Sequence, residues 1–330
     1  MKTSCLINNF NYADYVCEAI QSVLDQTQLV DQIVVVDDGS TDRSCTRIEA
    51  EFGSLERVVL IRKSNSGQLS CFNRGMREVS GDVVFFLDAD DRYRPDYVSR
   101  AVSVFKQHST VDFLTVADQQ TGPNAVPPSS LPSRDLGLST LAALLDRKWV
   151  GGVTSSLSMR TALARQILPC ALESEWRTRA DDVLVFGASI LGAHKYYLGA
   201  PLIEYRLHGR NCFAGQRFTA VQQMRYALAV NQLIAWYGQR AGLDANRLPP
   251  LLHREFRTIE RPSLREWINY FSLTWRQRTP WSLRVRQSFA LTAHAIGQRR
   301  KAAPRKRCVS PSPAQIQRSP VGVSASSPSG

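Results

Sequence analysis

The chain has 330 residues, of which 43% are hydrophobic and 21% charged, and this balance is typical of a globular protein and excludes disorder over most of its length. The net charge of +12 is concentrated in residues 240–330, which hold 17 Lys and Arg against 4 Asp and Glu, so we expect no nucleic-acid partner for the nearly neutral remainder. The sequence contains no run of 18 apolar residues, so a membrane span is not expected. It also contains no Cys-x-x-Cys pair, so a zinc site is not expected. We therefore expect a cytoplasmic protein with free thiols.

Residues 1–118 alternate short apolar runs with segments of helical periodicity. The predicted strands are residues 3–7, 32–36, 58–61, 83–87 and 111–116. The predicted helices are residues 12–26, a segment after the Gly39–Asp42 turn, a segment from Ser66 to about Gly81, and residues 95–108. Such alternation predicts an α/β fold with a mostly parallel sheet and helices on both of its faces.

The second half is less regular. Residues 119–134 are rich in Pro, Ser and Gly, which indicates a loop. The predicted helices are residues 136–145, 181–191 and 216–240, and further amphipathic helices with Arg on their polar faces within residues 251–298. Residues 301–330 have almost no large apolar side chains, so we expect a disordered tail there.

Polar residues follow each of the first four predicted strands. They are Asn8–Asn11, Asp37–Ser40, Asn65–Gln68 and Asp88–Asp91. The carboxyl ends of parallel strands meet at one edge of a sheet, which is where open α/β sheets bind ligands. The sequence therefore predicts a ligand site at this edge.

Three carboxylates within four residues, Asp88, Asp90 and Asp91, would repel each other unless a cation lies between them. Carboxylates combined with water and phosphate oxygens are typical of Mg²⁺ and Mn²⁺ sites. Neither a G-x-x-x-x-G-K-[ST] nor a G-x-G-x-x-G loop follows the first strand, so a backbone cradle for phosphates is not expected. These features predict a divalent metal that shares a diphosphate with the carboxylates.

Six segments together resemble a known family. They are Leu6–Asn11, Val36–Asp42, Asn65–Gly67, Asn73–Gly75, Gly81–Asp82 and Phe86–Asp91. In this order and spacing they resemble the family 2 inverting glycosyltransferases, which have the GT-A fold. The resemblance implies a donor-binding half over residues 1–118 and an acceptor and catalytic half over 119–215. A basic helical extension over 216–300 and the tail 301–330 would follow.

The resemblance also implies the roles of the first polar clusters. Phe10 and Asp38 would contact the nucleotide base of a nucleotide-sugar, most often a UDP-sugar, and Asn8 would lie in the same pocket. Asp88 and Asp91 would bind the ribose and diphosphate, and Asp90 would bind Mn²⁺ or Mg²⁺. The family's usual Pro-Thr-Tyr or Pro-Ser-Tyr is Asn8-Asn9-Phe10 here, which is a departure at the base-binding position.

Inversion requires a base that takes a proton from the attacking hydroxyl group. The family places it in an acidic pair at a helix start, which corresponds to Asp182, with Asp181 as the alternative and Glu173 and Glu175 next. A Y-R-x-H element implies Arg206 at the diphosphate and His208 as a metal ligand. For two further residues, Trp149 and Trp176, a place in the core is favoured over a place in the acceptor pocket.

These inferences predict a metal-dependent inverting glycosyltransferase that acts on a glycan or lipid-linked acceptor in cell-surface polysaccharide or glycoconjugate synthesis. One alternative is a sugar nucleotidyltransferase, although the Gly-rich loop that it needs is missing. Another is a basic membrane-binding or nucleic-acid-binding module. Residues 240–307, including the aromatic stretch Trp267–Trp275, could attach the enzyme to the anionic inner face of the plasma membrane.

Overall fold

The computed structural model describes residues 1–123, 125–128, 131–209, 211 and 218–302, with the backbone alone for 299–302. Its strands are β1 (Thr3–Asn9), β2 (Gln32–Asp37), β3 (Val58–Arg62), β4 (Val83–Asp88), β5 (Arg92–Tyr93), β6 (Phe113–Thr121), β7 (Arg134–Gly137), β8 (Leu157–Arg160) and β9 (Lys195–Arg206). They form one sheet in the order β3-β2-β1-β4-β8-β6-β9-β5, with β7 paired to β9.

The first half of the sheet confirms the predicted parallel arrangement. Strand β1 pairs in parallel with β2 on one side and with β4 on the other, and β2 pairs in parallel with β3. Strand β8 then pairs antiparallel with both β4 and β6, so that β6 and its parallel neighbour β9 run in the same direction as the first four strands. The short strands β5 and β7 pair antiparallel with β9. The sheet is therefore mixed. Its parallel part, strands β1–β4, contains the carboxyl ends at which the ligand site is predicted.

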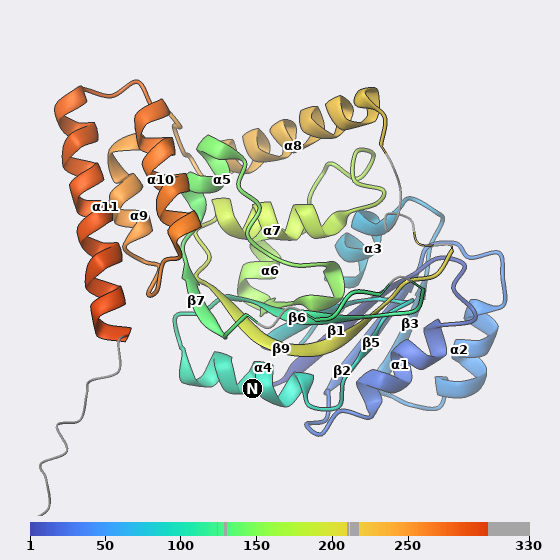
Figure 1. Cartoon of the computed structure of the whole chain (residues 1–330). Coiled ribbons are helices and arrows are strands. Elements are labelled where there is room, and N and C mark those ends of the chain that lie inside the picture. Colours follow the sequence, from blue (N-terminus) through green and yellow to red (C-terminus); the bar gives the residue numbers. More distant parts are fainter. Residues whose placement is uncertain (124, 129–130, 210, 212–217, 303–330) are drawn as a thin grey trace, which may run out of the picture.

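The described helices are α1 (Val16–Leu24), α2 (Ser44–Phe52), α3 (Gln68–Gly75), α4 (Tyr97–Gln107), α5 (Thr140–Asp146), α6 (Thr161–Ile167), α7 (Ala180–Ile190), α8 (Ala220–Arg240), α9 (Leu252–Phe256), α10 (Leu264–Arg276) and α11 (Trp281–Ala302), with 3-10 turns η1 (Thr154–Ser156) and η2 (Pro249–Leu251). Figure 1 shows α1, α2 and α4 on one face of the sheet and α3, α6, α7 and α8 on the other.

Each strand of the parallel core sends apolar side chains to both layers. In β4, for example, Val84 and Phe86 pack into the core under α3 and α7, whereas Val83, Phe85 and Leu87 pack into the core under α1 and α4. Successive side chains of a strand point to opposite faces, so a strand covered on both sides must be apolar throughout. This explains why the sequence reads as continuous apolar runs there.

Two sequence-based boundaries in the middle of the chain are wrong. The strand predicted at residues 111–116 continues to Thr121 in β6, because its end pairs with Ile203–Arg206 of β9 despite the polar composition. The helix predicted at residues 136–145 begins only at Thr140. Residues before it form β7, and Gly137 at its end has a φ of +64°, which favours glycine, while its missing side chain leaves room for the backbone of Thr258.

The C-terminal helices build a third, smaller core. Leu252 and Phe256 of α9, Tyr270 and Leu273 of α10, and Leu291 of α11 pack together beside α5. Helix α8 starts at a capping box formed by Thr219 and Gln222, and its second half packs in the same core as α7. The predicted helix start at residue 216, and most of the predicted tail, lie outside the described residues. The predicted division into four segments stays a prediction.

Across the part of the chain that the structure describes, no helix is both long enough and apolar enough to cross a membrane. Cys5, Cys17, Cys45, Cys71 and Cys170 are free thiols, as expected, whereas Cys212 and Cys308 lie outside the described residues.

Candidate active site

A cavity of about 570 Å³ opens at the carboxyl ends of β1, β2 and β4. Six predicted site residues line it, and they come from four separate segments of the chain: Asn8, Phe10, Asp38, Asp88, Asp90 and Asp181. The other predicted residues, Asp91, Asp182, Arg206 and His208, are not among its lining residues. The fold thus brings the predicted polar clusters together at one edge, as expected for a parallel sheet.

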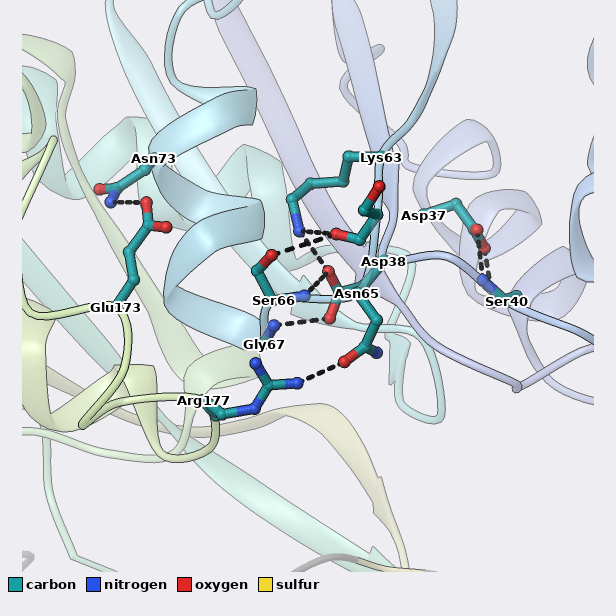
Figure 2. A network of polar contacts seen from close by, with 11 residues as sticks. Asp37, Asp38, Ser40, Lys63, Asn65, Ser66, Gly67, Asn73, Glu173 and Arg177 are labelled. Atoms are coloured by element: carbon teal, nitrogen blue, oxygen red, sulfur yellow. Dashed lines mark hydrogen bonds and ion pairs between the residues drawn. The ribbon is translucent and has the colours of Figure 1, made fainter.

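Buried polar contacts fix the loops after β1 and β2. The Asp37 carboxylate accepts a hydrogen bond from Asn9 Nδ2 at 2.7 Å. It also accepts hydrogen bonds from Ser40 Oγ at 2.6 Å and from the Ser40 backbone N–H at 2.8 Å (Figure 2). Asn11, with a φ of +57°, accepts the backbone N–H of Thr41 at 2.8 Å. Asp37 is 1% exposed and supports the site from beneath, whereas Asn9, also 1% exposed, and Phe10, 44% exposed, line the cavity.

Asp38 is held at the cavity wall by the start of α3. Its carboxylate accepts the backbone N–H groups of Ser66 at 2.9 Å and Gly67 at 2.7 Å, and it forms an ion pair with Lys63 (Figure 2). Gly67 has a φ of +99°, and a side chain there would overlap the backbone of Arg177. Glycine is therefore required where the loop before α3 meets the segment before α7.

The two acids of the D-x-D segment that face the cavity have different environments. Asp88 accepts a hydrogen bond from Gln68 Nε2 at 2.7 Å, and burial, reinforced by the negative charge of Asp90, raises the pKa of Asp88 to about 7. Asp90 lies 3.1 Å from the imidazole Nε2 of His208. Burial and the crowding of carboxylates therefore favour the binding of a proton, a cation or a positively charged ligand at this site.

Asp91 does not have the predicted position at the cavity. It is 1% exposed, and its two carboxylate oxygens accept Ser155 Oγ at 2.5 Å and the backbone N–H of Arg206 at 3.0 Å. Burial, with the charges of Asp90 and Asp88, raises its pKa well above the ordinary range. Asp91 therefore joins η1 and the end of β9 to the D-x-D segment, and its predicted contact with a ligand stays a prediction.

Arg206 and His208 of the Y-R-x-H element differ in their orientation. Arg206 Nη1 forms an ion pair with Glu18 of α1 at 2.8 Å, and the guanidinium lies over the Tyr15 ring. Its buried Nε and Nη2 have no hydrogen-bond partner among the described residues, and the predicted contact with a diphosphate stays a prediction. Tyr205, its neighbour on β9, lines the cavity instead. His208 stacks on Tyr15 with ring centroids 4.8 Å apart and holds its imidazole beside Asp90.

Among the described residues, no group of three or more His, Cys, Asp and Glu side chains is arranged to hold a metal ion. The pair of Asp90 and His208 supplies one oxygen and one nitrogen donor atom beside the cavity. Such a pair fits Mn²⁺ or Mg²⁺ only if a bound ligand and water complete the coordination.

The acidic pair at the start of α7 is divided between cavity and core. Asp181 lines the cavity, and burial together with the charges of Asp182 and Asp88 raises its pKa to about 7. Asp182 is fully buried and accepts hydrogen bonds from Arg179 Nε at 2.9 Å and from the Tyr226 hydroxyl at 3.0 Å. In this structure Asp181, rather than the predicted Asp182, faces the cavity, and the choice of the catalytic base between them stays a prediction.

The remaining candidates are also separated by the structure. Glu173 accepts Asn73 Nδ2 at 2.6 Å (Figure 2), Glu175 is exposed, and neither lines the cavity. Trp176 is 2% exposed in the core, as expected. Trp149 is 38% exposed and lines the cavity, so its predicted place in the core is wrong.

Sequence reasoning placed Gln68 in a polar cluster at this edge without giving it a role, and Arg177 and Arg179 are among the lining residues that it missed. Arg177 donates a hydrogen bond to Asn65 Oδ1 (Figure 2). Arg179, whose backbone has a φ of +61°, forms an ion pair with Asp182. The two arginines lie shortly before the acidic pair, so the run Arg177–Asp182 places two positive charges ahead of two negative ones. That clustering of opposite charges was a usable signal for a site that handles a charged ligand.

Comparisons with known proteins agree with this arrangement. Residues 4–167 match the sequence profile of glycosyl transferase family 2. The chain is 31% identical to the uncharacterized glycosyltransferase alr2836 of Nostoc sp. over 86% of this chain and 85% of that protein. It is 25% identical to the putative glycosyltransferase EpsH of Bacillus subtilis over 62% of this chain and 60% of that protein.

The fold resembles that of Staphylococcus aureus TarS. Residues 1–349 of TarS in complex with UDP-GlcNAc superpose with a TM-score of 0.56 at 18% identity, over 91% of this chain and 90% of that chain. A structure of TarS with UDP gives a TM-score of 0.53 at 19% identity, over 91% and 89% of the two chains. At this identity the likeness concerns the fold.

Proposed function

The chain belongs to glycosyltransferase family 2 and has the GT-A fold, and from this premise we propose that it transfers a sugar from a UDP-sugar to a glycan or lipid-linked acceptor with inversion. One observation carries the proposal: a single cavity collects Asp38 after β2, Asp88 and Asp90 after β4, and Asp181 at the start of α7. The sheet edge would bind the donor, and the α7 side would receive the acceptor. The activity would serve polysaccharide or glycoconjugate synthesis at the cell surface.

The donor nucleotide would lie between Phe10 and Asp38. Phe10 offers an exposed aromatic face at the cavity, and base-to-aromatic stacking is worth about 1–3 kcal/mol per base. Asp38 and Asn8 line the same wall. The complexes of TarS with UDP-GlcNAc and UDP support a uridine nucleotide for a protein of this fold.

Asp90 and His208 would hold Mn²⁺ or Mg²⁺, and Asp88 would face the ribose or diphosphate. Their fit rests on the paired oxygen and nitrogen donor atoms and on the crowded carboxylates described above. When bound, the cation would offset negative charge on the departing diphosphate. Arg177 and Arg179, which also line the cavity, would add positive charge near the same group.

Asp181 would act as the general base. A carboxylate with a pKa near the working pH is well suited to accept a proton in the transition state, and Asp181 has that pKa while facing the cavity. Asp182 would hold Arg179 and Tyr226 in place behind it. Trp149, partly exposed on the same wall, would offer a flat apolar face to an acceptor sugar.

The proposal is tested by incubating the protein with a panel of UDP-sugars and acceptor glycans and following UDP release with Mn²⁺, with Mg²⁺ and with EDTA. Turnover should require the metal, Asp90→Ala should lose metal-dependent UDP binding while keeping its melting temperature, and NMR should find an inverted anomeric centre. Full turnover in EDTA would remove the metal assignment. A product of retained configuration would contradict inversion.

We also propose that the C-terminal helices attach the enzyme to the anionic inner face of the plasma membrane. Trp281, Phe289 and Ile296 are spaced eight and seven residues apart on one side of α11 and are 74%, 72% and 47% exposed. Arg284 and Arg286 on the same helix would meet lipid headgroups. The basic residues predicted to contribute at 305–307 lie outside the described residues.

Co-sedimentation with phosphatidylglycerol-containing vesicles tests this attachment. The double variant Trp281→Ala/Phe289→Ala should lose binding, whereas Leu29→Ala, a change at a site that is 64% exposed on the opposite part of the chain, should retain it. Equal binding to neutral and anionic vesicles, or binding by the double variant, would contradict the proposal.

A further inference from the structure

The side chain of Gln68 joins the two halves of the cavity. Its Nε2 donates to Asp88 Oδ1 at 2.7 Å and lies 3.3 Å from Thr154 Oγ1, and its Oε1 accepts the backbone N–H of Ala180 at 2.9 Å. Asp88 ends β4, and Ala180 is the first residue of α7. One amide therefore reaches from the donor edge of the sheet to the helix that carries Asp181.

Backbone contacts place Gln68 for this role. Its own N–H donates to the carbonyl of Arg177 at 2.8 Å, and the N–H of Leu69 donates to the carbonyl of Trp176 at 3.3 Å. Gly67, with no side chain, allows this close approach. These two backbone bonds hold residues 176–177, and the first N–H of α7, that of Ala180, donates to the Gln68 side chain.

A helix start leaves its first backbone N–H groups without partners inside the helix. At α7 the residue before the helix, Arg179, has a left-handed backbone and makes no side-chain cap bond. The Gln68 Oε1 therefore caps the start of α7, although Gln68 belongs to α3. A change in its length or chemistry would move or loosen the turn that presents Asp181, and it would also release Asp88.

We propose that Gln68 is a positioning residue that fixes the acceptor-side base relative to the donor-side carboxylate. The inference rests on the proposed function, in which Asp88 meets the donor and Asp181 deprotonates the acceptor. Gln68 acts through both residues and transfers no proton itself. A reacting group that is misplaced by about 1 Å can lower the rate ~10²-fold. Loss of the two hydrogen bonds made by the Gln68 amide should therefore have a large effect on turnover.

Two substitutions distinguish the hydrogen bond with Ala180 from the contact with Asp88. Gln68→Met keeps the length and removes both bonds, whereas Gln68→Glu keeps an oxygen for Ala180 and turns the contact with Asp88 into a repulsion. The matched control is Gln26→Met. Gln26 is 4% exposed, and its amide likewise bridges two elements, donating to the carbonyls of Ser22 and Arg94 and accepting the Val98 N–H, away from the cavity.

Hydrogen–deuterium exchange and kinetics are measured on the full chain with UDP and Mn²⁺ as the binding probe. Gln68→Met should speed amide exchange at the start of α7 and lower kcat by ~10- to 100-fold. Gln68→Glu should leave exchange at α7 near the wild-type rate and weaken UDP binding. Gln26→Met should lower the melting temperature by about as much as Gln68→Met does, while its kcat stays at the wild-type value.

The proposal is overturned if Gln68→Met resembles Gln26→Met, with a lower melting temperature and unchanged kcat, or if exchange at α7 is unaffected. Should Gln68→Met fail to fold, Gln68→Asn, whose shorter amide cannot reach both partners, takes its place. A wild-type chain that turns over no UDP-sugar would contradict the proposed function instead, and the exchange comparison would still decide the role of Gln68.

Discussion

Substitution of each member of the acidic pair on α7 by asparagine should produce two different defects. Asp181→Asn keeps the shape of the side chain at the cavity and removes the proton acceptor. A positioned general base contributes ~10²–10⁴-fold, so kcat should fall by about that factor. UDP affinity should change little, because the predicted donor contacts come from the ends of β1, β2 and β4.

The structure also sets the pH dependence. Because the pKa of Asp181 is about 7, roughly three-quarters of the wild-type protein has the base ready at pH 7.5 and about one-tenth at pH 6. The kcat should therefore fall roughly eightfold between these pH values. Asp182→Asn removes a neighbouring negative charge that contributes to the raised pKa, so its acid limb should move to lower pH while most of the activity at pH 7.5 remains.

As the pH rises, kcat should increase, whereas the stability of the folded state should decrease. Folding raises the pKa of Asp181 from 3.8 to about 7, so the folded state binds more protons than the unfolded state between these values and loses stability as the pH rises through that window. Asp181→Asn lacks this loss and should melt higher than wild type at pH 8, with no difference near pH 3. Asp182→Asn weakens the contacts of a buried carboxylate with Arg179 and Tyr226 and should cost ~1–3 kcal/mol.

One kinetic and thermal series on the three proteins decides between the two residues. Initial rates at saturating UDP-sugar and acceptor give kcat, and thermal melts across pH 3–8 give stability. The reasoning would be refuted by a larger kcat loss in Asp182→Asn than in Asp181→Asn at saturating substrates. A melting temperature of Asp181→Asn that follows wild type at every pH would refute the assigned burial of its charge.

Three further outcomes are expected from the site geometry. Phe10→Ala should weaken UDP binding by ~5- to 100-fold in a calorimetric titration, whereas Phe10→Tyr should retain it, and equal affinity of Phe10→Ala and wild type would place the base elsewhere. Gly67→Ala should destabilise the fold by ~2–3 kcal/mol or more in urea melts, because it combines a φ of +99° with overlap on the Arg177 backbone; wild-type stability would contradict that approach. Asn73→Ala should cost ~1–3 kcal/mol, because it breaks buried hydrogen bonds with Cys170 and Glu173, and it should leave the kcat unchanged.

Much of the donor edge could be predicted because its signals are local. The strands of the parallel core are apolar on both faces, so their runs end sharply where polar residues begin, and Asp38 and Asp88 follow those ends directly. Parallel strands must bring their carboxyl ends together, and the cavity lies there. The positions of Asn8, Phe10 and Asp90 follow from the same rule.

The acceptor side could not be predicted to single residues because α7 is buried on all sides. From Asp182 to Ile190 every residue is buried, so the helix has no alternation of polar and apolar residues that would identify its outer face. Asp181 and Asp182 are 100° apart around the helix, and only the left-handed turn at Arg179 decides which of them meets the cavity. The sequence carries no pattern that specifies this turn.

The direction in which the Arg206 side chain points, by contrast, could have been predicted from the sequence. Residues 205 and 206 are consecutive on β9, and consecutive side chains of a strand point to opposite faces, so Tyr205 and Arg206 could not both face the cavity. With Tyr205 on the cavity side, Arg206 must point towards α1, where Glu18 meets it. His208 lies beyond the end of the strand and is free of this constraint, so it can reach Asp90.

The same reasoning explains why the two halves of the cavity need a separate link. The donor acids are fixed by strand ends and by backbone N–H groups, whereas Asp181 is fixed by the phase of a helix that starts at a strained residue. Hydrogen bonds within β1–β4 cannot set that phase, because α7 crosses the sheet as a separate layer. A side chain that bonds both Asp88 and the first N–H of α7 is the most direct way to relate them, and Gln68 is placed to do so.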